Sequence, residues 1–255
     1  MYQKKHKEQF EVLFYHLDRN GFASIKSIVN FLQATTTKHG RLLEANIEDL
    51  SDKNLTWVFS RFHIKIFKYP KQFDIINCTT WRSGSKGCFA FREYEGFDEN
   101  NDLFCSATAS AALIDLHTRK PVEIPEFIQN QFAPEYGRAI HDNFEKLHKL
   151  ENADNIKEFS VRMGDIDLNN HVNNSSYFEW IIECVPEKVL LNYKIIEIEI
   201  NYQAEVFYGE SIVSHTSLVN HDDDNNIIYH HKLNRKEDGK TIALARTIWE
   251  EYRYR

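Results

Sequence analysis

Two stretches of the chain, residues 18–24 and 167–173, share one order of residue types, and this similarity constrains the fold more than any other feature. Both read Asp, any residue, Asn, any residue, an aromatic side chain, a small apolar residue and a helix N-cap. The second stretch lies 149 positions after the first. The same order of predicted elements surrounds both stretches, which indicates a duplicated structural unit.

A helix is predicted directly after each stretch. The first covers residues 24–39 and ends at Gly40, a residue type that often terminates helices. Its apolar face is made by Ile25, Ile28, Val29, Leu32 and Thr36. The second helix begins at the N-cap Asn173 and stops before Pro186. Its apolar positions follow the helical spacing and are Tyr177, Trp180, Ile181 and Cys184.

Strand patterns separated by turn-rich joins account for most of the remaining chain. In the first half they are expected at 10–15, 55–69, 73–82, 87–96 and 103–116. In the second half they are expected from 156 and at 192–207, 211–219, 226–235 and 240–252. Residues 121–155 are expected to connect the halves, with one short helix at 135–149. A helix followed by an antiparallel meander is an α+β pattern rather than a βαβ alternation.

The two copies differ at one position that matters for chemistry, because the first has Phe22 where the second has His171. A His just before a helix is well placed for acid–base chemistry, and the amides near Val172–Asn174 are candidates for stabilising an oxyanion. A polar turn that only caps a core helix would have the same composition. We interpret the asymmetry as one catalytic half and one half that forms a pocket wall.

A candidate carboxylate, Glu205, follows a stretch in which apolar and polar residues alternate. Alternation from Ile196 onward places Glu205 on the same polar face as Glu197 and Glu199. The pattern does not distinguish the three glutamates. A solvated carboxylate is the simplest interpretation of each of them.

Composition excludes several classes of protein. The formal net charge of -7 argues against a general nucleic-acid binder. No apolar run approaches the ~18 residues that span a bilayer, and no signal peptide is visible. The cysteines at 78, 88, 105 and 184 lack metal-ligand spacing and fit core packing, so we expect a reduced, cytoplasmic protein with no metal and no cofactor.

Ordered motifs extend along nearly the whole chain. In the first half they lie at 57–66, 69–70, 80–84, 106–110 and 118–125, and in the second half at 167–174 and 204–206. Together they resemble the acyl-ACP thioesterases, plastid and bacterial enzymes that release fatty acids from acyl carrier protein. The number of motifs at family-like spacing makes the resemblance specific.

The resemblance implies a tandem (double) hot-dog fold, in which each antiparallel sheet wraps around one long helix. The implied organisation is an N-terminal hot-dog at 1–125 with the acyl-chain pocket, a linker at 126–155 and a catalytic C-terminal hot-dog at 156–255. The implied catalytic residues are Asp167, Asn169, His171 and Glu205. Candidates for the acyl pocket, each of which also fits plain core packing, are Ile28, Val29, Leu32 and Phe59.

One departure from the family bears on mechanism. Many plant members have a Cys directly after the Glu, where this chain has Val206. Cys184 follows His171 by 13 positions, which is about 20 Å along a helix at ~1.5 Å per residue, so a Cys–His covalent route is not expected. We expect water to attack the thioester, with Glu205 and His171 handling its proton and Asn169 holding the water or polarising the carbonyl.

The implied partner is acyl carrier protein bearing a fatty acyl chain. That partner is acidic, so a basic patch is expected despite the net charge, and the candidates are Lys65, Lys68, Lys71, Arg82 and Lys86. No nucleic acid and no membrane span are expected, and a homodimer is compatible with the sequence. The competing hypotheses are an acyl-CoA thioesterase, a hot-dog dehydratase and a non-catalytic acyl-thioester sensor.

Overall fold

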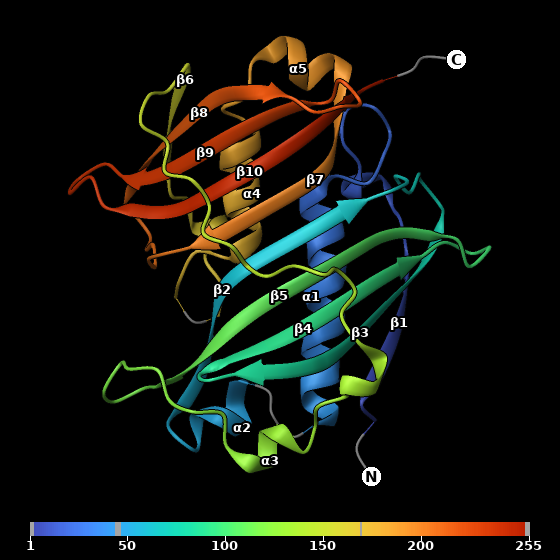
Figure 1. Ribbon diagram of the computed structural model, residues 1–255, viewed down its shortest axis with the longest axis vertical. Coiled ribbons are helices and arrows are strands. Elements are labelled where there is room, and N and C mark those ends of the chain that lie inside the picture. Colours follow the sequence, from blue (N-terminus) through green and yellow to red (C-terminus); the bar gives the residue numbers. More distant parts are fainter. Residues whose placement is uncertain (1–2, 44–46, 169, 253–255) are drawn as a thin grey trace. The chain divides into compact units, whose positions relative to one another are not determined.

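The structure is a computed structural model that describes residues 3–43, 47–168 and 170–252 (Figure 1). The chain divides into two compact units, Met1–Asn143 (unit 1) and Phe144–Arg255 (unit 2). Each unit contains five antiparallel strands and its own central helix. In the described part of the chain, no helix has the length and apolar character needed to cross a membrane.

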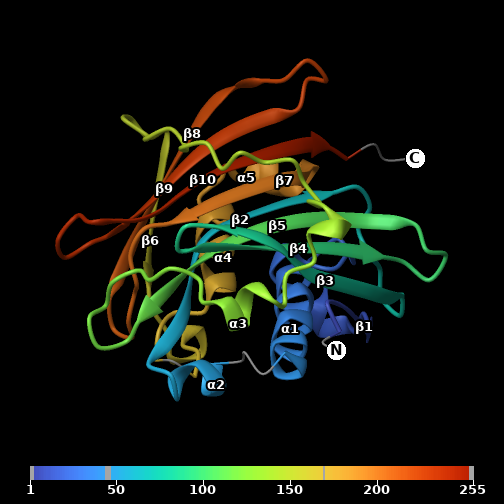
Figure 2. The ribbon, with the colours of Figure 1, turned by 60° about the horizontal axis from the view of Figure 1, so that its bottom comes forward.

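Unit 1 is a five-stranded sheet packed against a long helix. Its strands lie in the order β1-β3-β4-β5-β2 and pair antiparallel throughout. The strands are β1 Lys5–Glu11, β2 Leu55–Ile66, β3 Ile75–Lys86, β4 Phe89–Phe97 and β5 Leu103–Asp115. The helices are α1 Ile25–Leu42, α2 Ile47–Ser51 and α3 Glu126–Gln129, with short 3-10 turns at Phe14–His16 and Pro134–Tyr136. Figure 2 shows α1 beneath the sheet of its own unit, where it contacts β1 and β3.

The start of α1 agrees with the prediction and its end does not. The Ser24 hydroxyl accepts a hydrogen bond from the Ser27 amide, so Ser24 is the N-cap. Ile28, Val29 and Leu32 are buried against the sheet. The helix passes through Gly40, which is buried, and ends at Leu42. A glycine terminates a helix when it adopts a left-handed conformation, and Gly40 is not among the glycines with positive φ.

Unit 2 repeats this plan with a shorter helix. Its strands pair antiparallel in the order β7-β10-β9-β8-β6. They are β6 Asn155–Ser160, β7 Tyr193–Tyr202, β8 Ser211–His221, β9 Ile227–Arg235 and β10 Thr241–Glu251. Helix α4 Asn174–Ile182 contacts β8 and β9, and a second helix, α5 Glu187–Asn192, begins after Pro186. A 3-10 turn at Met163–Asp165 precedes α4.

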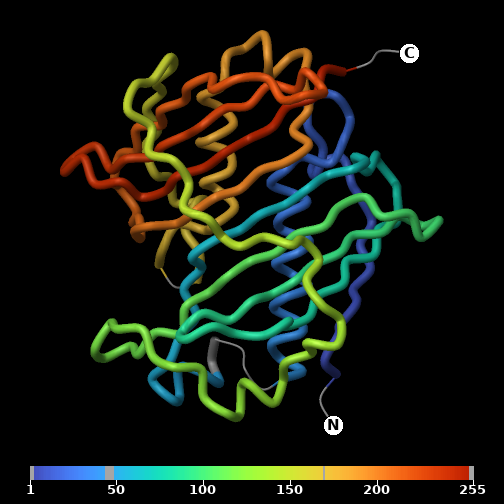
Figure 3. The backbone as a smooth tube through the Cα atoms, viewed as in Figure 1, coloured from blue at the N-terminus to red at the C-terminus, as the bar shows by residue number. Residues whose placement is uncertain are grey.

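The α+β class and the succession of strands along the chain are confirmed. The predicted meander is wrong for one strand of each unit, because β2 pairs with β5 and β7 pairs with β10 rather than with the strand that follows it. Three local predictions are also wrong. The first strand is residues 5–11 rather than 10–15. No helix forms at 135–149 beyond the 3-10 turn, and residues 144–154 follow an extended course (Figure 3). Strand β7 ends at Tyr202 rather than at 207. Periodicity detects the core of an element well but its ends poorly, because ends depend on contacts with distant residues.

A buried histidine makes the stability of unit 2 dependent on pH. His231 on β9 is fully buried, with its two ring nitrogens each 2.8 Å from a hydroxyl, those of Thr216 and Thr247. Burial lowers the pKa of His231 to about 3. The unfolded chain therefore binds more protons than the folded chain between that pH and the ordinary pKa near ~6.5, and stability falls as the pH is lowered through this window.

We expect the urea concentration at the unfolding midpoint to decrease when the pH is lowered from 7 to 5. This decrease should be smaller in the His231→Gln variant. The free energy of unfolding of the wild type should decrease by at most ~1.4 kcal/mol per pH unit more than that of the variant. The exposed His221, substituted to Gln, is the matched control and should keep the pH dependence of the wild type. The same pH dependence in the His231→Gln variant and in the wild type would contradict the assignment.

Candidate active site

A hydrogen-bonded turn holds His171 immediately before α4. The Asp167 amide donates to the His171 carbonyl at 2.8 Å, and the His171 amide donates back to the Asp167 carboxylate at 3.3 Å. Asn170 completes the turn with a φ of 60° and an amide that donates to the Asp167 carbonyl. Asn tolerates this left-handed conformation better than most residues. Asp167 therefore orders the backbone of the turn.

The first turn of α4 is capped by Asn173, as predicted. The Asn173 side chain accepts from the Ser175 amide at 2.9 Å. The oxyanion prediction is wrong for two of its three amides, because Val172 donates to the Val206 carbonyl and Asn173 donates to the Asp165 carbonyl. The amide of Asn174 remains, and within the described residues it donates to no backbone acceptor. Of the three amides, it therefore remains the candidate donor for an oxyanion.

Glu205 lies beyond the end of β7, in the loop that leads to β8. The prediction that Glu205 lies on the polar face of a strand is therefore wrong. The hydrogen bond from the Val172 amide to the Val206 carbonyl, 3.0 Å long, ties this loop to the turn that holds His171. As a result His171 Nε2 lies 3.8 Å from Glu205 Oε1, and each side chain is about one third exposed, at 30% and 31%.

This imidazole–carboxylate pair can handle a proton on a small molecule placed between its members. A separation of 3.8 Å is too long for a direct hydrogen bond, but two groups at this distance can both contact one water. The partial exposure of both side chains leaves them accessible from solvent. The arrangement fits hydrolysis better than attack by a protein nucleophile.

Two aromatic side chains that were not among the predicted site residues lie next to the pair. The Phe207 ring meets the His171 ring edge-on, with 5.1 Å between centroids. The Tyr177 hydroxyl donates to the Ala204 carbonyl at 3.4 Å, next to Glu205. Burial raises the pKa of Tyr177, and the negative charge of Glu205 raises it further, so this hydroxyl stays protonated. The position of Phe207, two residues after the candidate glutamate, was the available signal.

Unit 1 contains the same backbone frame with different side chains. The Asp18 amide donates to the Phe22 carbonyl at 2.7 Å, and the Phe22 amide donates to the Asp18 carboxylate at 3.2 Å. The Ala23 amide donates to the Pro70 carbonyl, as Val172 does to Val206. The counterpart of His171 is therefore Phe22, and the counterpart of Glu205 is Tyr69. The centroids of their rings lie 6.2 Å apart. Neither side chain is of a type that gains or loses a proton near neutral pH.

The structure separates Glu205 from the other candidate carboxylates. Glu197 lies on β7 and pairs with Arg246 at 2.7 Å. Glu199, also on β7, is buried and lies 3.8 Å from the same Arg246. Asn169 lies outside the described residues. Cys184 is buried, with its thiol 3.2 Å from the Ser214 carbonyl.

The candidates for the acyl pocket all lie in unit 1. Ile28, Val29 and Leu32 are buried on α1, and Phe59 on β2 is half-buried, 6.5 Å from the Phe62 ring. These side chains form part of the apolar layer between the helix and its sheet.

The predicted basic patch is wrong at one position. Arg82 is buried, donates to the Gln131 side chain and lies over the Trp57 ring. Lys68 is exposed but pairs with Asp98 at 2.6 Å. Lys65 is half-buried, and the exposed lysines of the remaining run are Lys71 and Lys86.

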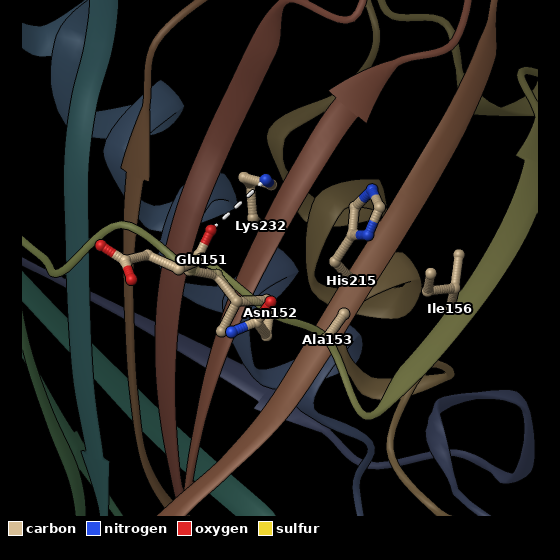
Figure 4. A pocket seen from close by; sticks show the side chains of 7 residues that line it. Glu151, Asn152, Ala153, Ile156, His215 and Lys232 are labelled. Carbon is tan, nitrogen blue, oxygen red and sulfur yellow. Dashed lines mark hydrogen bonds between the residues drawn. The ribbon is translucent and has the colours of Figure 1, made fainter.

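A pocket elsewhere in unit 2 is distinct from the His171–Glu205 pair. It lies where residues 150–153 cross β8 and β9, and Figure 4 shows His215 and Lys232 side by side within it. The Lys232 ammonium donates to the Leu150 carbonyl at 3.4 Å. Neither His171 nor Glu205 lines this pocket, so it is separate from their acid–base chemistry.

Family models match both units. The acyl-ACP thioesterase N-terminal domain matches residues 3–132, and the acyl-ACP thioesterase C-terminal domain matches residues 148–251. The His171–Glu205 pair therefore lies in the part that matches the C-terminal domain.

Curated relatives are plant enzymes. The chloroplastic acyl-[acyl-carrier-protein] hydrolase FATB3 of Cuphea viscosissima is 27% identical over 255 residues, which is 95% of this chain and 62% of that protein. The chloroplastic oleoyl-acyl carrier protein thioesterase 1 of Arabidopsis thaliana is 23% identical, over 96% of this chain and 76% of that protein. The chain thus spans about three fifths of the length of the first of these relatives.

Solved structures share the fold. The 12:0-ACP thioesterase of Umbellularia californica aligns with a TM-score of 0.88 at 24% identity, over 99% of this chain and 96% of that one. An acyl-ACP thioesterase of Bacteroides thetaiotaomicron aligns with a TM-score of 0.82 at 24% identity, over 97% and 98% of the two chains. The predicted double hot-dog fold is confirmed by these alignments.

Proposed function

Because this chain belongs to the acyl-ACP thioesterase family, we propose that it hydrolyses the thioester of a fatty acyl-[acyl carrier protein] to a free fatty acid and the carrier protein. The observation that supports this most is the approach of His171 to Glu205, 3.8 Å apart, in unit 2. The equivalent positions of unit 1 have aromatic side chains, so the chemistry is assigned to one unit.

In the proposed mechanism, water attacks the thioester carbonyl carbon. Glu205, with His171 beside it, orients the water and accepts its proton as the new carbon–oxygen bond forms. The carbon–sulfur bond of the tetrahedral intermediate then breaks, and the proton passes to the leaving sulfur. The products are a carboxylic acid and the free thiol of the carrier protein, so atoms and charge balance without a cofactor.

The developing oxyanion needs a donor close to the reacting carbon. The Asn174 amide at the N-terminus of α4 is the backbone candidate, and the positive end of the helix dipole adds to it. The side chain of Asn169 is the second proposed donor, to the water or to the carbonyl. Asp167 acts on the turn rather than on the substrate.

The acyl chain is proposed to occupy the apolar layer of unit 1. Ile28, Val29 and Leu32 offer a continuous apolar stripe on α1, with Phe59 on the facing sheet. Burying each methylene of an acyl chain contributes about 0.8 kcal/mol, so a slot of this kind selects chain length by the space it offers.

The direct test is to incubate the protein with a mixture of acyl carrier proteins bearing C8 to C18 chains and to identify the free acids released. We expect release from acyl carrier protein at a kcat/KM at least tenfold above that for the matching acyl-CoA. Preference for acyl-CoA would favour a CoA-directed thioesterase. Binding without release of acid would favour a non-catalytic sensor, and dehydration of a 3-hydroxyacyl thioester would favour a dehydratase.

Removing either member of the pair should abolish most of the activity while the fold stays intact. We expect His171→Ala and Glu205→Ala each to lower kcat by about 10²- to 10⁴-fold, because each removes a positioned acid–base group. Circular dichroism checks the fold, and His221→Ala and Glu183→Ala, at exposed positions of the same unit, serve as controls. Near-normal turnover by both active-site variants would refute the assignment.

Filling the proposed slot should shift the products toward shorter chains. We expect Leu32→Phe to lower the ratio of C16 to C12 acid released, because the larger ring occupies space in the apolar layer of unit 1. Ile181 occupies the corresponding position of unit 2, so Ile181→Phe is the matched control and should leave the ratio unchanged. An unchanged ratio in the Leu32→Phe variant would place the slot elsewhere.

A further inference from the structure

Arg235, the last residue of β9, joins three separate groups around the loop that contains Glu205. Its Nη2 donates to the Glu205 carbonyl at 2.9 Å, and its Nε lies 3.1 Å from Glu210 Oε1. Its Nη1 donates to Asp238 Oδ2 at 3.0 Å. The side chain is only 18% exposed. The guanidinium is rigid and planar, so its two hydrogen bonds hold the Glu205 carbonyl and Asp238 relative to one another. Its contact with Glu210 is an ion pair without hydrogen-bond geometry.

The second carboxylate oxygen of Glu210 extends this connection toward His171. Glu210 Oε2 accepts a hydrogen bond from the Phe207 amide at 3.0 Å. The Phe207 ring in turn packs edge-on against the His171 ring. Arg235 is therefore linked to one member of the pair through the Glu205 carbonyl, and to the other through Glu210 and Phe207.

The corresponding loop of unit 1 is tied differently, because there the cation, Lys68, lies in the loop and the acid, Asp98, follows the strand. Asp74 takes the place of Glu210 and accepts a hydrogen bond from the Lys71 amide at 2.7 Å. The hydrogen bond from a loop amide to this acid is therefore present in both units. Asp98 directly follows β4, and extending the β3–β4 register by one residue beyond the Asn77–Phe97 pair brings Asp98 to the position that Arg235 occupies opposite Ile212 in unit 2. The Asp98 carboxylate accepts from the amides of Asn100 and Asp102 in its own turn, and from Lys68. Unit 2, which has the His–Glu pair, thus has a guanidinium at this position. Unit 1, which lacks the pair, has a carboxylate there.

We propose that Arg235 is a positioning residue for the hydrolysis: it holds the Glu205 backbone and the Phe207 ring so that the Glu205 carboxylate and the His171 imidazole share one water. This inference rests on the proposed function, because it assigns Arg235 a role in that reaction. It requires no contact between Arg235 and the substrate. A misplacement of about 1 Å in a catalytic group can cost about 10²-fold in rate, so a loosened loop lowers kcat more than it weakens substrate binding.

The test compares Arg235→Met and Arg235→Lys with the wild type on the best acyl carrier protein substrate. We expect Arg235→Met to lower kcat by about 10- to 100-fold with KM within about twofold. The kcat of Arg235→Lys should lie between those of the wild type and Arg235→Met. One ammonium keeps the charge near Glu210 but cannot also reach the Glu205 carbonyl and Asp238. The neighbouring Lys236, which pairs with Glu158 at the surface, provides the control variant Lys236→Met, expected to keep the wild-type kcat.

A double-mutant cycle separates positioning from a general loss of structure. In a Glu205→Ala background, Arg235→Met should lower the remaining rate by less than about twofold, because without the Glu205 carboxylate there is no shared water for Arg235 to maintain. If Arg235→Met does not fold by circular dichroism, Arg235→Lys supplies the same cycle. A wild-type kcat in the Arg235 variants, or an equal loss with and without Glu205, would overturn the proposal. Failure of the wild-type protein to release any fatty acid would instead refute the proposed function.

Discussion

The pairing of backbone groups between the turn before each helix and the loop after one strand is the constraint on which the site depends. In unit 2 the turn closes between Asp167 and His171, and the Val172–Val206 hydrogen bond joins it to the loop that contains Glu205. These bonds involve main-chain groups that must find partners once they are buried. The turn, the loop and the helix start are therefore held in place whatever side chain stands at position 171 or 205.

Unit 1 shows the consequence of this independence. The same backbone bonds hold Phe22 and Tyr69 where unit 2 has His171 and Glu205, so a duplicated frame is compatible with either chemistry or packing. The third difference lies in the contact that ties the loop to the neighbouring strand end, which Lys68 and Asp98 make in unit 1 and Arg235 makes in unit 2. The two units thus differ both at the acid–base positions and at the residues that hold the loop.

The environment of Val206 bears on the nucleophile. Its side chain is fully buried, while its carbonyl accepts the hydrogen bond from Val172. A thiol at this position would point into the core, whereas His171 and Glu205 are each about one third exposed. Burial also raises the pKa of a thiol and makes it a poorer nucleophile. The burial of position 206 therefore favours water as the attacking group, whichever residue occupies that position.

The sequence by itself determined the repeat, the succession of strands along the chain, the helix starts at Ser24 and Asn173, and His171 as the acid–base candidate. These are encoded by local periodicity and by short-range caps, which neighbouring residues fix. The family resemblance pointed to Glu205, which the alternation alone did not distinguish from two other glutamates. Only the tertiary structure decided that Glu205 lies 3.8 Å from His171, where α1 ends, that Arg82 is buried and that Arg235 contacts the loop. Those outcomes depend on contacts between residues far apart in the chain, such as Glu205 with His171 or Arg235 with Glu205, and no local pattern contains that information.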